Sequence, residues 1–354
     1  DYPDQLRAAL DLVDYDGWRA RQRQVRAEGR RIGVGISAHV EGSGYGPYEG
    51  ALVRVDASGH VTIHSGSNSH GQGHETTLGQ VCADALGVPV GQVRVRHGDS
   101  SLLPFGGGTN ASRSAVTAGS AVHLAATKVR EKATAIAAHL LEVDPADMVL
   151  ERGRLFPTGA PERALDLVEV ARAAAPGNPL PGGMEPGLEA EAYFVPPTVT
   201  FSSGTHVAVV EVDEELGTVK ILRYVVVDDC GRALNPMIVD GQQHGGVAHG
   251  IGNALLEEAV YDEQGQLLTA SFMDYLIPTT MEVPPIQVEH REHPSPLNPL
   301  GVKGCGEGGT VSVPAAVTNA VADAMHPLRL RLTEVPLTPE RLVRAIREAR
   351  ESGT

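Results

Sequence analysis

Four glycine-rich stretches hold the residues best suited to chemistry, and each precedes a segment with a helical pattern. Three of them are 71–75, 106–113 and 301–309, and the fourth begins at Gly241. The first turn of a helix presents free N–H groups and the positive end of the helix dipole, and glycine lets a ligand lie against the backbone. Several such ends that converge would suit a large polyanionic cofactor. Glycine turns before helices are also common as plain connections, so the pattern alone leaves both interpretations open.

His70 and His74 are the residues whose spacing comes nearest to a metal site. They stand four residues apart beside Glu75, but they do not complete an H-E-x-x-H pattern and they fall in a predicted loop. A zinc enzyme or unrelated hydrolase built on these three residues remains an alternative hypothesis, and we predict no side chain that ligates a metal. The sequence has no Walker A motif, and no G-x-G-x-x-G follows its first strand in the context that a dinucleotide requires.

Composition narrows the possible classes of protein. The 354 residues carry a formal net charge of −15, so we expect no nucleic-acid binding through phosphate contacts. Three widely spaced cysteines argue against a zinc ribbon, a ligated iron–sulfur cluster or a disulfide framework, and they fit a reducing cytoplasm. No apolar run approaches the roughly 18 residues of a membrane span, and no signal peptide is visible. The chain begins at Asp1, and we expect a fragment, a processed chain or a trimmed subunit.

The pattern of the whole chain predicts an α+β fold with mixed β-sheets covered by helices. Residues 1–30 are expected to form a charged helical connector. The order strand–strand–helix–strand–helix then occurs twice, which indicates two similar subdomains, 31–185 and 186–354, the second with the 301–309 loop. Within them the predicted elements are strands and a hairpin in 31–66, helices at 75–86 and 114–142, a hairpin at 201–229, a short strand or extended segment at 271–278, and helices near 240–258, 314–325 and 338–350.

Five motifs give the chain a resemblance to a known family. They are GQGHETTLGQ (71–80), GGGTNASRS (106–114), NPMIVDGQQHGGVAHGIGNALLEE (235–258), FMDYLIP (272–278) and NPLGVKGCGEGG (298–309). In order and spacing they resemble the large subunits of xanthine oxidase, aldehyde oxidase and carbon monoxide dehydrogenase, the molybdenum hydroxylases. The resemblance covers essentially the whole chain and implies the C-terminal half of the molybdopterin-binding subunit, with two cofactor-binding subdomains.

The resemblance assigns a role to particular residues. Glu307 matches the glutamate that acts as general base, so we expect an ionised but mostly desolvated carboxylate near the metal centre. Gln72 and Gln242 match glutamines that contact the pterin, and residues 34–42 match a wall of the substrate pocket. His249 stands where many relatives have glutamine, which puts a contact from that position in doubt. The cofactor-binding residues that the resemblance implies are Gly71, Gln72, Gly73, Thr109, Ala111, Ser112, Arg113, Ser114, Gln242 and Gly306, with Arg113 expected to add positive charge beside a pyrophosphate.

The family also implies a cofactor, partners and a reaction. The cofactor is molybdopterin with molybdenum, and in bacteria usually the cytosine dinucleotide. The substrate is an aldehyde, a nitrogen heterocycle or carbon monoxide, oxidised by attack of a Mo–OH oxygen and hydride transfer to Mo=S. The expected partners are the N-terminal half of the subunit and chains or domains carrying iron–sulfur clusters and FAD, in a hetero-oligomer or a dimer of such complexes. The alternative is a cofactor-free scaffold or assembly partner with the same fold.

Overall fold

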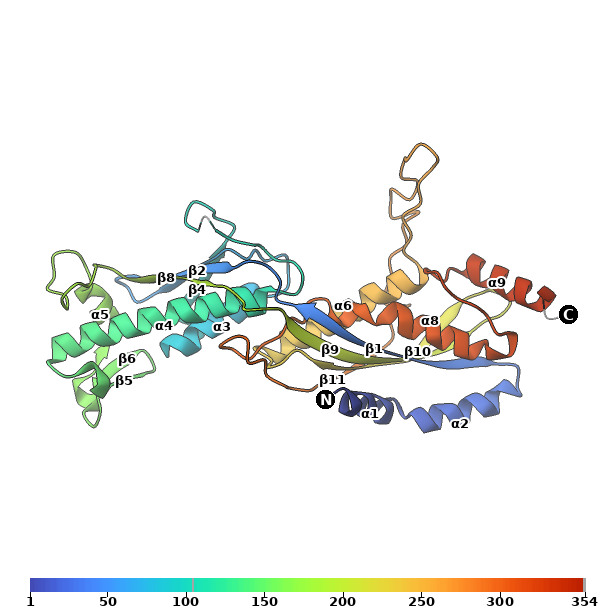
Figure 1. Ribbon diagram of the computed structural model, residues 1–354, viewed down its shortest axis with the longest axis horizontal. Coiled ribbons are helices and arrows are strands. Elements are labelled where there is room, and N and C mark those ends of the chain that lie inside the picture. Colours follow the sequence, from blue (N-terminus) through green and yellow to red (C-terminus); the bar gives the residue numbers. More distant parts are fainter. Residues whose placement is uncertain (104, 353–354) are drawn as a thin grey trace.

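The computed structural model describes residues 1–103 and 105–352 and shows an elongated molecule of two lobes (Figure 1). Each lobe follows the same order of two strands, a helix, a strand and a helix. In the first lobe these are β2 (Glu49–Val55), β3 (Val61–Ser65), α3 (His74–Leu86), β4 (Val93–His97) and α4 (Ser114–Leu141). In the second they are β9 (Thr200–Val212), β10 (Val219–Asp229), α6 (Pro236–Leu255), β11 (Ile286–His290) and α8 (Val313–Ala324).

The two central sheets have the same topology. One has the order β4-β3-β2-β8, and the other has the order β11-β10-β9-β1. In each, the first pair of strands is parallel and the next two pairs are antiparallel. The predicted α+β class with two similar subdomains and mixed sheets is therefore confirmed.

The fourth strand of each sheet comes from the part of the sequence that was predicted to form the other subdomain. The strand β1 (Arg31–Ser43) precedes the first lobe in sequence but pairs along its whole length with β9. The strand β8 (Leu188–Phe194) follows the predicted boundary at residue 185 but pairs with β2. Strand pairing therefore cuts across the predicted ranges 31–185 and 186–354, because alternating hydrophobicity identifies a strand but not its partner. The chain crosses between the lobes twice, at residues 44–48 and 195–199.

The second sheet is covered by helices on both faces, which explains its nearly continuous apolar strands. On β9, Val207 and Val209 face α1 (Tyr2–Val13) and α2 (Tyr15–Arg26), whereas Ala208 and Val210 face α6 and α8. The predicted helical segment 1–30 thus forms two helices that pack on this sheet (Figure 1). Gly35 of β1 lies so close to α8 that an added Cβ would be 2.1 Å from the Ala316 carbonyl oxygen, so a side chain is excluded there.

In the first lobe, α3 and α4 cover one face of the sheet. The apolar side chains of β2 and β3 pack there against the buried side of α4. Gly87 ends α3 in a left-handed conformation, φ 64°, as its glycine predicted. The remaining elements are the small sheet β5 (Met148–Glu151), β6 (Arg154–Pro157) and β7 (Leu165–Asp166), the helices α5 (Leu167–Ala173), α7 (Gly308–Val311) and α9 (Pro339–Ser352), and the 3₁₀ turns Val90–Gln92, Pro145–Asp147, Pro161–Arg163 and His326–Leu328.

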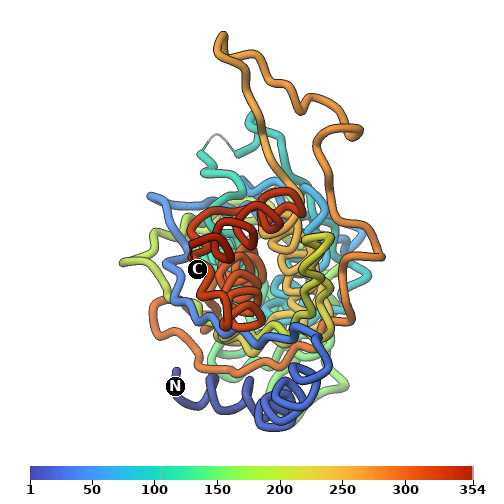
Figure 2. Tube along the Cα trace, turned by 90° about the vertical axis from the view of Figure 1, so that its right-hand side faces the viewer, coloured from blue at the N-terminus to red at the C-terminus, as the bar shows by residue number. Residues whose placement is uncertain are grey.

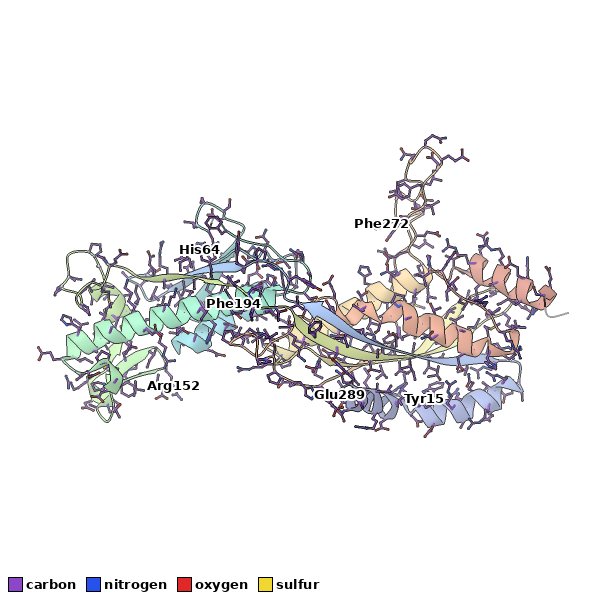
Figure 3. The ribbon with its side chains drawn as sticks, in the orientation of Figure 1. Tyr15, His64, Arg152, Phe194, Phe272 and Glu289 are labelled. Carbon is purple, nitrogen blue, oxygen red and sulfur yellow. The ribbon has the colours of Figure 1, made fainter. Side chains whose placement is uncertain are left out.

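Two sequence predictions differ from the structure. The helix expected from Gly241 begins earlier, at Pro236, because the Asn235 side chain caps it by accepting a hydrogen bond from the Ile238 N–H, 3.1 Å away. The segment 271–278, expected to be a short strand or extended, contains turns instead. It belongs to an arm between α6 and β11 that projects from the body in both views (Figures 1 and 2) and carries Phe272, 81% exposed (Figure 3). No helix in the described part of the chain is long and apolar enough to cross a membrane.

Candidate active site

A cavity of about 310 Å³ lies where the two lobes meet. Each lobe contributes both of its loop-to-helix connections to the cavity wall. The helices α3, α4 and α6 all begin there, so of the two interpretations left open by the sequence, the structure agrees with helix N-termini that converge on one site. The lining residues comprise His70, Gln72, His74, Thr77 and Leu78; 109–115; Cys230, Arg232, Leu234, Asn235, Ile238, Val239 and Gln242; and Val302, Lys303, Cys305, Gly306 and Glu307.

Most of the residues singled out in the sequence lie on this wall. They are Gln72, Thr109, Ala111, Ser112, Arg113, Ser114, Gln242, Gly306 and Glu307. Gly71 and Gly73 are not among the lining residues. Both have positive φ values, 111° and 77°, so they shape the turn that presents Gln72. His249 is exposed on α6 outside the cavity lining. Sequence reasoning assigned no role to Arg232 or Asn235, although Asn235 opens the motif 235–258 and Arg232 lies shortly before it.

Glu307 is held by a single neighbour across the lobe boundary. The Ser112 hydroxyl donates a hydrogen bond to Glu307 Oε2 over 2.9 Å, and the Glu307 N–H donates to Ser112 Oγ over 3.0 Å. Ala111 and Ser112 have φ values of 47° and 48°, a left-handed conformation that costs energy for residues with a side chain. The two loops touch closely, because a Cβ on Gly304 would lie 2.0 Å from the Ser112 carbonyl oxygen.

The Glu307 side chain is exposed in this chain, contrary to the expectation that it would be mostly desolvated. The other polar bonds of its loop explain how it is presented. Lys303 Nζ is 2.9 Å from Asp229 Oδ2, and the N–H of Gly304 donates to Ser43 Oγ over 2.9 Å. The loop is therefore fixed just before the carboxylate, while the carboxylate itself lines the cavity.

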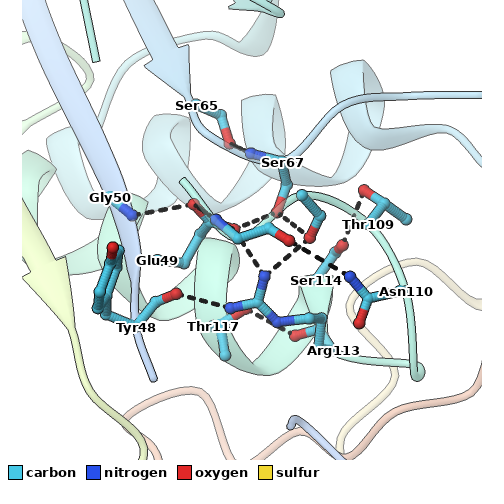
Figure 4. Close-up of polar contacts among 12 residues, drawn as sticks. Tyr48, Glu49, Gly50, Ser65, Ser67, Thr109, Asn110, Arg113, Ser114 and Thr117 are labelled. Carbon is cyan, nitrogen blue, oxygen red and sulfur yellow. Dashed lines mark hydrogen bonds and ion pairs between the residues drawn. The ribbon is translucent and has the colours of Figure 1, made fainter. Parts of the chain in front are cut away.

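Arg113 has a different environment from the one predicted (Figure 4). Its side chain is 2% exposed, and its Nη1 forms an ion pair of 3.0 Å with the fully buried Glu49. The same guanidinium donates to the carbonyl oxygens of Tyr45, Tyr48 and Gly108. The expectation of a free positive charge beside a pyrophosphate was wrong, because these protein acceptors satisfy the guanidinium. Its side chain instead joins the crossing segment 44–48 to the loop before α4.

The chemistry of the wall fits a pterin cofactor. Gln72 Oε1 accepts a hydrogen bond from the His70 N–H over 2.7 Å, but the buried Gln72 Nε2 has no hydrogen-bond partner. His74 is the first residue of α3, and its buried Nδ1 likewise has no hydrogen-bond partner. A buried polar atom without a partner is costly, so both atoms are suited to a polar ligand at this wall. Gly306 lies between Ser112 and Gln242, with room for a ligand to approach the backbone.

Comparisons with known proteins identify the family of this chain. A family model described as molybdopterin cofactor-binding domain matches residues 8–284. The nicotine 6-hydroxylase large subunit of Paenarthrobacter nicotinovorans is 44% identical over 96% of this chain and 43% of its own length. The carbon monoxide dehydrogenase large chain of Afipia carboxidovorans is 39% identical over 91% and 42%. The solved quinoline 2-oxidoreductase from Pseudomonas putida 86 has a TM-score of 0.91 and 41% identity, covering 98% of this chain and 45% of that one.

The fold and the site therefore define a molybdopterin-binding domain. The chain belongs to the family of molybdenum hydroxylase large subunits, as the five sequence motifs predicted. It spans less than half the length of these relatives.

Proposed function

We propose that this chain is the C-terminal, molybdopterin-binding part of a molybdenum hydroxylase, with Glu307 as its general base. The observation that carries the proposal is the placing of Glu307. Its carboxylate lies on the wall of a cavity that also holds an unpartnered amide donor, Gln72 Nε2. A base must lie within hydrogen-bonding reach of the proton that it takes, and a fixed loop with a free carboxylate meets this requirement.

The residues of the cavity wall have two proposed roles, cofactor binding and proton transfer. Gln72, Gln242 and the N–H groups at the start of α4 would bind the pterin and its phosphates, since amides both donate and accept hydrogen bonds. When bound, the molybdenum cofactor supplies the two-electron redox chemistry of the hydroxylation. Glu307 accepts the proton that the reaction releases, while Ser112 holds its carboxylate in one orientation. The cytosine dinucleotide is the form of the cofactor that we propose.

The proposal extends to partners and substrate. Because the chain spans less than half of its relatives, the rest of the large subunit, and chains or domains with iron–sulfur clusters and FAD, are proposed to complete a hetero-oligomeric cytoplasmic enzyme. The substrate is proposed to be an aldehyde, a nitrogen heterocycle or carbon monoxide. The wall described here leaves that choice open, since the remaining half of the subunit would supply most of the substrate pocket.

The first test is elemental analysis of the complex purified from its native source, with mass spectrometry of the chains that copurify. We expect stoichiometric molybdenum together with iron–sulfur and flavin chains. A complex without molybdenum and without partners would favour the cofactor-free scaffold. Zinc in place of molybdenum would favour the enzyme built on His70, His74 and Glu75.

The second test is Glu307→Gln in the assembled enzyme. The amide keeps the shape of the side chain but cannot take a proton, so turnover should fall by about 10²–10⁴-fold, the usual contribution of a general base. The molybdenum content should not change. Glu263→Gln, in the exposed arm and away from the cavity, is the matched control for the loss of one charge. Turnover of Glu307→Gln close to that of the control would refute the assignment.

A further inference from the structure

The strand β10 ends in two adjacent carboxylates, Asp228 and Asp229, each 3% exposed. Successive residues of a strand point to opposite faces, so the two side chains contact different parts of the molecule. Asp228 accepts a hydrogen bond from Gln243 Nε2 of α6 over 3.2 Å and pairs with His290. Asp229 instead contacts the loop that carries Glu307.

The Asp229 carboxylate is a junction of three chain segments. Its Oδ1 accepts the N–H of Gly231, 2.8 Å away in the turn after β10, and the N–H of His293, 3.3 Å away in the segment after β11. Its Oδ2 lies 2.9 Å from His293 Nδ1 and 2.9 Å from Lys303 Nζ. The strands β10 and β11 are parallel, so both end at this edge of the sheet and bring these donors together.

The contacts keep Asp229 ionised in spite of its burial. Burial raises the pKa of the carboxyl group, but the hydrogen bonds from Lys303, Gly231 and His293 outweigh it, so the pKa lies below its ordinary value. The Lys303 side chain is itself 13% exposed. The ion pair of Lys303 and Asp229 is therefore an anchor inside the protein, where solvent weakens it less than it would at the surface.

The Glu307 loop needs such an anchor because glycine makes up much of it. Three of the six residues 301–306 are glycine, the residue that restricts the backbone least. After Glu307 the loop is held by packing, since a Cβ on Gly309 would lie 2.7 Å from the Gln243 carbonyl oxygen of α6. Before Glu307 it is held by a side chain as well, through the anchor at Lys303.

We propose that Asp229 is a positioning residue, which holds the loop through Lys303 and so sets the place of the Glu307 carboxylate on the cavity wall. The inference rests on the proposed role of Glu307 as the base. Lys303 is among the residues that line the cavity and Asp229 is not, so Asp229 acts through Lys303. A reacting group misplaced by about 1 Å can lose roughly 10²-fold in rate, so a distant anchor is enough to control turnover.

The first test is the steady-state kinetics of Asp229→Asn in the assembled enzyme. In either orientation the amide nitrogen faces a hydrogen-bond donor, and the charge that pairs with Lys303 is removed while the shape is kept. We expect kcat to fall by roughly 10–100-fold, because the base is displaced. KM and molybdenum content should stay near those of wild type, because the rest of the wall is unchanged. An unchanged kcat would overturn the inference.

The second test asks whether the two residues act as one unit. Lys303→Met removes the other half of the anchor and should lower kcat by a similar factor. Because both substitutions break the same contact, Asp229→Asn/Lys303→Met should lower kcat no further than either single variant. Losses that multiply would count against a shared anchor. Lys303→Arg keeps a cation on a long side chain, so it should retain more of kcat than Lys303→Met.

The matched control is Asp323→Asn. The Asp323 carboxylate likewise accepts hydrogen bonds from a cation, an amide and a backbone N–H, which belong to Arg19, Gln22 and Val34. It joins α8 to α2 and β1 and is not among the residues that line the cavity. The variant should lower the unfolding midpoint in denaturant but leave kcat unchanged in its absence. An equal loss of kcat in both variants would mean that Asp229 acts only on the stability of the fold.

Hydrogen exchange of the loop amides gives a readout that does not depend on turnover. The N–H groups of residues 302–304 all donate hydrogen bonds to groups outside the loop, so they should exchange slowly in the wild-type complex. Loss of either half of the anchor should speed up the exchange of peptides that cover 301–309, whereas Asp323→Asn should not. A loss of kcat without faster exchange of this loop would overturn the positioning role.

The outcomes separate this inference from the proposed function. Wild-type turnover of Glu307→Gln would remove the base, and the positioning role with it. If Glu307→Gln is inactive while Asp229→Asn and Lys303→Met keep wild-type kcat and exchange, the base stands and the positioning role is wrong. Should Asp229→Asn not assemble, Lys303→Met decides, because Asp229 then keeps its contacts with Gly231 and His293.

Discussion

The loops that precede α4 and α8 hold equivalent places in the two lobes, yet they use their charged residues in opposite ways. The first loop encloses Arg113 completely and pairs it with Glu49. The second leaves Glu307 exposed, with one serine of the first loop as its hydrogen-bond donor. Both loops are rich in glycine, both precede a helix, and both line the same cavity.

This difference shows that a charged residue in a glycine-rich loop is not functional by type alone. Arg113 has protein acceptors for its guanidinium, so it fixes the geometry of the cavity. Within the described part of the chain Glu307 forms no ion pair, and its side-chain hydrogen-bond donor is Ser112. The first lobe thus encloses its charged residue, and the second lobe presents the carboxylate that we propose as the base.

The largest effect on stability is expected from Arg113→Met. It leaves the buried Glu49 without its cation, with only hydrogen bonds such as that from Ser67 Oγ, and removal of one partner of a buried ion pair typically costs about 3–5 kcal/mol. The unfolding free energy should fall by that amount in denaturant titrations, and molybdenum should be lost with the loop geometry. In contrast, Glu307→Gln should unfold near the wild-type midpoint.

The control for Arg113→Met is the double variant Glu49→Gln/Arg113→Met. Because no charge then remains buried, the double variant should be more stable than Arg113→Met alone. A destabilisation of Glu307→Gln as large as that of Arg113→Met would remove the contrast between the two loops.

A smaller difference between the lobes is expected in the pH dependence of the unfolding free energy. The equivalent strands β4 and β11 end at His97 and His290. Asp228 and Asp240 raise the pKa of His290 to about 9, chiefly through the hydrogen bond that His290 Nδ1 donates to the Asp228 carboxylate. Because the pKa of His290 is raised in the folded protein, its charged form stabilises the fold fully below a pH of about 6.5. This stabilisation is lost as the pH rises through about 9. We expect His290 to contribute about 1–2 kcal/mol to the unfolding free energy after allowance for solvent screening.

Unfolding free energies measured from pH 6 to pH 10 would test this. His290→Asn should reduce the decline of the unfolding free energy above pH 7. His97→Asn, at the equivalent position in the first lobe, should have a smaller effect, because the Glu75 partner of His97 is exposed, with 53% of its side chain accessible. Equal effects of the two substitutions would mean that the lobes do not differ in this respect.

Much of the local structure was predictable from the sequence. Gly87 marked the end of α3, alternating apolar residues marked the β2–β3 hairpin, and the repeated order of elements marked the two lobes. The pairing of β1 with β9 was not predictable, because a strand with two apolar faces fits either sheet equally well. Most of the candidate site residues were found through the five motifs, although their roles remain predictions.

The misjudged residues share a physical cause. Arg113 is satisfied by Glu49 and by carbonyl groups 65 and 68 residues away in sequence, which no local pattern reveals. The hydrogen bond from the Gly304 N–H to Ser43 Oγ has the same kind of cause, because it depends on the pairing of β1 with β9 and joins residues 261 positions apart.

The pairing of β1 with β9 has a consequence for biosynthesis. Ser43 meets Thr200, which is made 157 residues later. At a ribosomal rate of about 5–20 residues per second, the finished β1 waits on the order of 10–30 s for its partner. During that interval all strands of the first lobe are completed, β8 last, while β1 has no partner strand. The site between the lobes therefore closes late in synthesis, and nascent chains should depend on chaperones that shield single unpaired strands.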